Sequence, residues 1–185
     1  QNEFDISRSG ITVDMPNGNH WVINGNSFYC TDTSDYYEGI MFNSQTSSND
    51  TISGNYFGGS ALSCGGNAWY VERDYKTLKF YSETGTNNYI LNNTIQNING
   101  RYMATDKKFY GIQFYSRGVI RGNIIGHPSD STKGIWLDMS VASEMFPIQA
   151  IADSVCDNII ANITMYCETH LMQNSVLEAP ANFTG

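Results

Sequence analysis

The chain has few charged residues, fewer basic than acidic ones, and no long apolar run. Charged residues make up 15% of its 185 residues, and 10 Lys and Arg stand against 18 Asp and Glu, a formal net charge of −8. Binding to a phosphate backbone requires clustered Lys and Arg, so nucleic acid is not an expected partner. No run of 18 apolar residues occurs, and the first residues lack the basic and apolar regions of a signal peptide, so no membrane span is predicted.

Histidine and cysteine are also sparse, and their spacing matches no metal motif. The four cysteines form no Cys-x-x-Cys pair and have no histidine in ligand register: Cys30, Cys64, Cys156 and Cys167. The sequence therefore predicts neither a metal site nor a cofactor. Cys156 and Cys167 could pair in a secreted protein, and buried free thiols are equally compatible with the pattern.

A short frame around an asparagine recurs along the chain. An aliphatic residue lies three positions before the asparagine, and an apolar residue usually lies two positions after it. The frame is clear at four asparagines and weaker at two more: Asn26, Asn55, Asn93 and Asn123, then Asn162 and Asn182. A second element, two apolar residues separated by one variable position, precedes the first five copies at 11–13, 40–42, 78–80, 112–114 and 135–137. Both elements alternate with period two between Gly, Asn and Ser, so each is predicted to be a short strand.

The intervals between the motif asparagines are irregular, from 20 residues (162 to 182) to 39 (123 to 162). A fixed motif with variable spacing indicates stacked coils that keep their strands and place insertions in the same loops. Asn tolerates the left-handed conformation of a sharp bend, and stacked side-chain amides can hydrogen-bond from coil to coil. We therefore expect one domain over 1–185, with insertions at 58–76 and 139–157.

The corner Ile-x-(Gly/Asn)-Asn-x-(Phe/Ile) and the strand Gly-Ile-x-Phe resemble those of the right-handed parallel β-helix superfamily, which includes pectate lyases, polysaccharide hydrolases and bacteriophage tailspikes. The resemblance covers nearly the whole chain. It implies an all-β fold, a single-stranded right-handed parallel β-helix of about six coils with loop insertions. An antiparallel sandwich with unrelated Asn turns is the alternative. Asn2 and Asn182 fall at the same phase of the repeat, which predicts a segment of a longer β-helix or a dependence on neighbouring chains.

The second element also predicts a surface. Its middle position and the position after it should face solvent, and successive coils should stack these side chains about 4.8 Å apart. The predicted ladder is Thr12 and Asp14, Met41 and Asn43, Lys79 and Tyr81, Gln113 and Tyr115, Trp136 and Asp138, with Glu83 and Arg117 one position further along. Aromatic rings beside amides and acids suit a sugar chain, so we expect substrate binding by Lys79, Tyr81, Gln113, Tyr115, Arg117 and Trp136. Contact between subunits is the alternative use of the same surface.

Catalytic carboxylates are harder to assign. Glycoside hydrolysis needs two carboxyl groups about 5 to 9.5 Å apart. Glu83 and Asp138, two coils apart, would lie about 10 Å or more from each other at strand spacing, a marginal pair. Within 58–76, we expect a projecting loop with Trp69 and Tyr70 as binding residues and Glu72 and Asp74 as candidate acids, or simply as a solvated charge run. The segment 139–157 is predicted to form a lid or, preferably, a subunit contact.

These features together predict a glycan-recognising segment of a viral or phage tailspike, or of a similar protein at the virion or extracellular surface. The resemblance implies binding, and in some members cleavage, of a host polysaccharide, by a homotrimer or by a helix with flanking coils. A secreted polysaccharide lyase or hydrolase of the pectate-lyase type is the second hypothesis. A structural stalk or adhesin without a ligand is the third.

Overall fold

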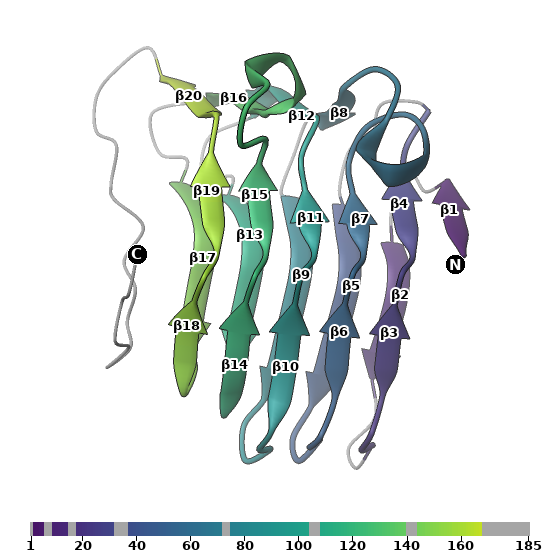
Figure 1. The fold of residues 1–185 in the computed structure, drawn as a ribbon, viewed down its shortest axis with the longest axis vertical. Coiled ribbons are helices and arrows are strands. Elements are labelled where there is room, and N and C mark those ends of the chain that lie inside the picture. Colours follow the sequence, from purple (N-terminus) through teal and green to yellow (C-terminus); the bar gives the residue numbers. More distant parts are fainter. Residues whose placement is uncertain are drawn as a thin grey trace.

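The computed structural model describes residues 2–5, 9–14, 18–31, 37–71, 75–103, 108–139 and 144–167. Within these residues the strands form four parallel sheets, which we name A to D (Figure 1). Two short 3-10 helices, η1 (Leu62–Cys64) and η2 (Ser131–Lys133), are the only helices in the described part of the chain. No helix there is long and apolar enough to cross a bilayer.

Each sheet contains strands that are far apart in the sequence and adjacent in space. Sheet A runs in the order β1 (Glu3–Asp5), β4 (Ser27–Tyr29), β7 (Tyr56–Phe57), β11 (Thr94–Ile95), β15 (Ile124–Gly126), β19 (Ile159–Ala161). Sheet B runs β2 (Ser9–Asp14), β5 (Tyr37–Ser44), β9 (Tyr75–Ser82), β13 (Lys108–Tyr115), β17 (Glu144–Ile151). Sheet C runs β3 (Val22–Asn24), β6 (Thr51–Ser53), β10 (Asn88–Leu91), β14 (Gly118–Arg121), β18 (Ser154–Cys156). Sheet D runs β8 (Trp69–Val71), β12 (Ile98–Met103), β16 (Ile135–Met139), β20 (Ile163–Cys167).

The chain visits the sheets in the order C, A, D, B and then repeats, which makes the molecule an all-β parallel solenoid. The prediction of stacked coils is confirmed, and the antiparallel sandwich is wrong, because the pairs between strands of successive turns are parallel. The expected number of about six coils was too high. In the described residues, three turns supply a strand to all four sheets, namely β6 to β9, β10 to β13 and β14 to β17, with partial turns on either side.

Columns of apolar side chains fill the solenoid. In sheet A the inward column is Phe4, Phe28, Phe57, Ile95, Ile125 and Ile160. The rings of Phe4, Phe28 and Phe57 lie parallel, with centroids 4.9 and 4.8 Å apart. That distance is the strand spacing, so parallel pairing in register stacks like side chains at van der Waals contact and removes their apolar area from water.

A ladder of asparagines lies at the bend between sheets C and A. The backbone N–H and side-chain Nδ2 of Asn55 both donate to Oδ1 of Asn93, each over 3.0 Å, and Nδ2 of Asn55 also donates to the Ile23 carbonyl. The same pattern joins Asn2, Asn26, Asn55, Asn93, Asn123 and Asn158. The side-chain amide thus satisfies backbone groups that the bend removes from the β ladder. The residue before each ladder asparagine from Asn26 to Asn158 adopts the left-handed conformation, as Gly54 and Asn92 illustrate with φ of 60° and 53°.

Two assignments made from the sequence were wrong. The rung after Asn123 is Asn158, 35 residues further along the chain, and not Asn162. Asn162 lies at the following bend, where its Nδ2 donates to the His127 carbonyl. Residues 135–137 belong to sheet D, and the fifth strand of sheet B is β17, inside the segment 139–157 that was expected to be an insertion.

The segment 58–76 is likewise partly solenoid. It contains η1, all of β8 and the start of β9. Asn182, with the rest of 168–185, lies outside the described residues.

Candidate functional site

The outer face of sheet B carries most of the side chains that the sequence assigned to a ligand site. Strand register aligns two outward rows along the solenoid: Thr12, Met41, Lys79, Gln113, Gln149, and Asp14, Asn43, Tyr81, Tyr115, Ile151. The predicted alignment is therefore confirmed for the first four strands. The binding roles of these residues stay predictions.

Two tyrosines and two glutamines form the centre of this face. The rings of Tyr81 and Tyr115 meet edge to face, with centroids 6.5 Å apart and planes at 60°, and both side chains are half-buried. In the neighbouring row, Nε2 of Gln113 donates to Oε1 of Gln149 over 2.9 Å. Because each amide has more donors and acceptors than this one bond uses, the pair can bind further polar groups.

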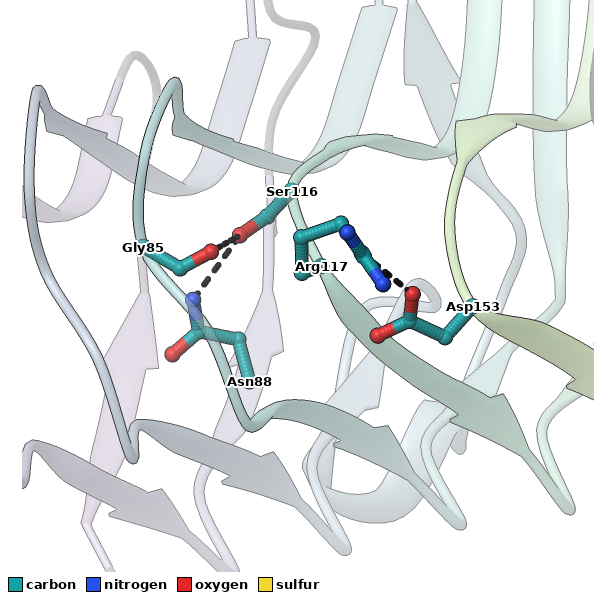
Figure 2. A network of polar contacts seen from close by, with 5 residues as sticks. All are labelled: Gly85, Asn88, Ser116, Arg117 and Asp153. Carbon is teal, nitrogen blue, oxygen red and sulfur yellow. Dashed lines mark hydrogen bonds and ion pairs between the residues drawn. The ribbon is translucent and has the colours of Figure 1, made fainter.

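Charged residues lie just beyond the tyrosines. Glu83 and Arg117 each follow the Tyr81–Tyr115 pair by two positions, and Arg117 Nε forms an ion pair with Asp153 (Figure 2). The Arg117 and Asp153 side chains are 68% and 43% exposed, so solvent screens the pair and it adds little stability. Asp153 was missed from the sequence, although it follows Ile151 as Arg117 follows Tyr115.

A buried polar network holds the bend beneath Arg117. Nδ2 of Asn88 donates to Oγ of Ser116 over 2.8 Å, and Ser116 Oγ donates to the Gly85 carbonyl (Figure 2). Nδ2 of Asn88 also donates to the Ser47 carbonyl over 3.0 Å. Asn88, Ser116 and Ser47 are almost fully buried. These side chains thus fix the bend between sheets B and C at Ser116, the residue before Arg117.

Trp136 does not continue the ladder of sheet B. It lies in β16 of sheet D, in register with Asn99 and Tyr70, and is 39% exposed. Trp136 and Tyr70 therefore share a different outer face from Tyr115. Trp69 is fully buried in the core, edge-on to Tyr75 with ring centroids 5.7 Å apart, so it cannot wall a groove as expected.

The predicted catalytic carboxylates are not brought together. Asp138 lies in β16 of sheet D, whereas Glu83 is exposed just after β9 of sheet B, so the spacing of two coils on one face is wrong. The Asp138 side chain, Glu72 and Asp74 lie outside the described residues.

The described part of the segment 58–76 folds onto the solenoid and does not project from it. The Ser63 N–H donates to Oγ of Ser27 over 2.9 Å, and Nζ of Lys133 donates to the Gly66 carbonyl over 2.9 Å. Nδ2 of Asn97, a buried side chain, contacts four successive carbonyl oxygens, those of Cys64, Gly65, Gly66 and Asn67, at 3.0 to 3.4 Å. The expected groove-forming loop was wrong for these residues, because Asn97 binds the loop to the bend between sheets A and D.

Cys64 and Asp50 are titratable groups buried in the interior of the solenoid. Cys64 and Cys156 are free thiols, so a disulfide at Cys156, one of the two options left open by the sequence, is wrong. Burial raises the pKa of Cys64 to about 12, and burial raises the pKa of Asp50, which accepts hydrogen bonds from Ser47 Oγ and the Trp21 N–H. In the described part of the chain, no three His, Cys, Asp or Glu side chains gather where they could hold a metal ion.

Comparisons with protein-family models, with curated proteins and with solved structures found no match to this chain.

Proposed function

We propose that the outer face of sheet B binds a neutral polysaccharide. The observation that carries this proposal is the edge-to-face pair Tyr81 and Tyr115, half-exposed beside the Gln113–Gln149 amide pair. Pyranose rings have apolar faces that pack on aromatic rings, and their hydroxyl groups bind amides. Both kinds of group occur here on adjacent strands.

The charge of the chain favours a neutral ligand over a polyanion. A formal net charge of −8 repels anionic polymers, and Arg117 on this face is already paired with Asp153. Lys79 is the one cation in the two outward rows of sheet B, and a single cation is not enough to bind a chain of phosphates or uronates. The ligand is thus expected to be recognised through hydroxyl groups.

The proposal is binding and not cleavage by the described residues of this face. Three of its carboxylates already have partners: Asp14 accepts from Asn43 Nδ2 over 3.2 Å, Asp153 pairs with Arg117, and Glu144 pairs with Lys108 over 2.5 Å. Glu83 is then left without a second carboxylate at the spacing that glycoside hydrolysis needs. Hydrolysis or elimination through Glu72, Asp74 or Asp138 remains the alternative proposal, as in a secreted lyase or hydrolase.

The class of protein to which this chain belongs is also a proposal. Parallel strands joined by crossovers are almost always right-handed, which supports a right-handed, single-stranded β-helix of the tailspike and pectate-lyase kind. Such a protein would act at the virion or extracellular surface, as a homotrimer or with flanking coils. The parallel sheets and the polar outer face of sheet B support this assignment.

A glycan array, followed by calorimetry with the best-bound neutral oligosaccharide, tests the proposal. Tyr115→Ala should weaken binding about tenfold, since an aromatic contact contributes about 0.5–1.5 kcal/mol beyond its buried area. Tyr89→Ala is the matched control, because Tyr89 is also half-buried but lies on sheet C. The proposal fails if no neutral glycan binds, or if the two variants lose affinity equally. Release of shorter saccharides would replace it with the enzyme alternative.

A further inference from the structure

The outer face of sheet D carries a row of side chains that is separate from the face of sheet B. In register along the solenoid, the row runs through Tyr70 of β8, Asn99 of β12, Trp136 of β16 and Thr164 of β20. Trp136 is 39% exposed, and Tyr70 is half-buried. The row therefore places two aromatic rings on alternate strands, with an amide on the strand between them.

The side-chain amide of Asn99 lacks the hydrogen bonds that such a group normally makes. Its Oδ1 is buried and has no hydrogen-bond partner, and no described residue bonds to its Nδ2. A buried polar atom without a partner is rare in a folded chain and requires an explanation. Because no bond holds this amide, it can turn either its oxygen or its nitrogen towards a ligand without breaking a hydrogen bond.

The spacing of the two rings differs from that of the tyrosines on sheet B. Tyr81 and Tyr115 lie on adjacent strands and meet edge to face. Tyr70 and Trp136 lie two strands apart, which is about 9.6 Å at the usual strand spacing. A polyproline II helix rises about 3.1 Å per residue, so its residues i and i+3 lie on the same side about 9.3 Å apart. The two repeats nearly coincide.

We propose that Tyr70, Asn99 and Trp136 bind a proline-rich segment of another protein in the polyproline II conformation. Prolines at i and i+3 pack on Tyr70 and Trp136, and Asn99 Nδ2 donates to a backbone carbonyl between them. This backbone forms no internal hydrogen bonds, so its carbonyls are available as acceptors. Its conformation is largely formed before binding, which lowers the entropic cost, and aromatic side chains are the surface on which such segments bind.

The net charge of the chain favours a basic segment. A formal net charge of −8 attracts a segment with Lys or Arg beside its prolines and repels an acidic one. An arginine can also stack on an exposed indole such as that of Trp136. The expected ligand of sheet D is thus a basic peptide, whereas the ligand proposed for sheet B is a neutral glycan.

Fluorescence anisotropy with two labelled peptides tests this proposal. One repeats Pro-Ala-Ala between flanking arginines, which places prolines at i and i+3, and the other has the same composition with the prolines two positions apart. The first should bind at least tenfold more tightly. Trp136→Ala and Tyr70→Ala should each weaken its binding about tenfold. Tyr89→Ala is the control on sheet C and should change nothing.

Asn99→Leu separates a ligand contact from a structural one. Because Asn99 Oδ1 makes no hydrogen bond, the urea midpoint should stay the same or rise, while peptide affinity should fall about fivefold. Trp136→Leu repeats the test if circular dichroism shows that Trp136→Ala is misfolded. Equal affinity for the two peptides, no binding of either, or unchanged affinity in the Trp136 variant overturns the proposal. So does a lowered urea midpoint of Asn99→Leu with unchanged affinity, or displacement of the peptide by a neutral oligosaccharide, which would make this face a sugar site.

Discussion

Replacing Asn93 with alanine removes a central rung of the asparagine ladder. The Asn93 side chain is fully buried and makes four hydrogen bonds, accepting from N–H and Nδ2 of Asn55 and donating to Oδ1 of Asn123 and the Ile52 carbonyl, each over 3.0 Å. Alanine would leave two hydrogens of Asn55 without an acceptor, the backbone N–H and one of the two on Nδ2, while the other Nδ2 hydrogen keeps the Ile23 carbonyl. At about 1–3 kcal/mol for each buried unsatisfied group, the free energy of unfolding should fall by roughly 2–6 kcal/mol. That is a large part of the roughly 5–15 kcal/mol typical of a domain.

Urea denaturation followed by tryptophan fluorescence measures this loss, and Trp69, fully buried, is a suitable reporter. Asn24→Ala is the matched control, because Asn24 is exposed two residues before the ladder and should change stability by at most about 0.5 kcal/mol. If Asn93→Ala costs less than about 1 kcal/mol, the ladder does not stabilise the bend as the hydrogen bonds imply.

Asn93→Asp tests the polarity of the ladder. Aspartate can still accept from Asn55, but when ionised it cannot donate to Asn123 Oδ1 or to the Ile52 carbonyl. Burial should raise the folded-state pKa of the new carboxyl above its unfolded value, so this variant should be most stable in acid and lose stability as pH rises through the raised pKa. A pH profile parallel to that of the wild type would contradict this account.

Two further substitutions, Gly85→Ala and Asp50→Asn, probe the bend between sheets B and C, and Gly25→Ala at the bend between sheets C and A is a control. Gly85→Ala should lower the free energy of unfolding by about 3 kcal/mol, because the new Cβ would lie 1.8 Å from the Ser47 carbonyl oxygen. Gly25→Ala should lower it by about 1 kcal/mol through the φ of 68° alone, since no atom lies within 4 Å of the new Cβ. Equal urea midpoints for the two variants would contradict the steric explanation. Burial raises the pKa of Asp50 above its usual 3.8, so the stability that the neutral carboxyl contributes is present below about pH 4 and is lost as pH rises through the raised pKa. Asp50→Asn should remove this loss, since Asn88 occupies the matching position one turn later, and parallel pH profiles of the urea midpoint would contradict it.

Local patterns predicted the repeat well and its end poorly. The frames at Asn26, Asn55, Asn93 and Asn123 were correct, because each has one aliphatic residue at the required position before the asparagine. At the fifth copy two frames fit: Val155 and Ile160 surround Asn158, while Ile159 precedes Asn162. Only the pairing of β18 with β14 decides between them, since the ladder asparagine must follow the strand of sheet C.

The residues of the candidate site were also predicted only in part. Rows through Lys79, Tyr81, Gln113 and Tyr115 followed from period two and a shared register. Trp136 was misplaced because a Gly-Ile-x-Leu strand reads the same in any sheet of a solenoid. Trp69 was misplaced because alternation alone does not tell which of two neighbours faces inward, and its column with Ile98 and Ile135 exists only in the folded chain.

The sequence by itself determined that this protein forms stacked parallel strands with an asparagine at one recurring bend, because that requirement is local to a few residues and repeats. Tertiary structure alone decided which sheet each strand joins, and therefore that Tyr115 faces Tyr81 while Trp136 faces Tyr70. It also decided that Ile160 is 47% exposed while Phe28, Phe57, Ile95 and Ile125 of the same column are fully buried. These outcomes depend on neighbours more than 25 residues away in the chain, whose register is set by backbone pairing between turns.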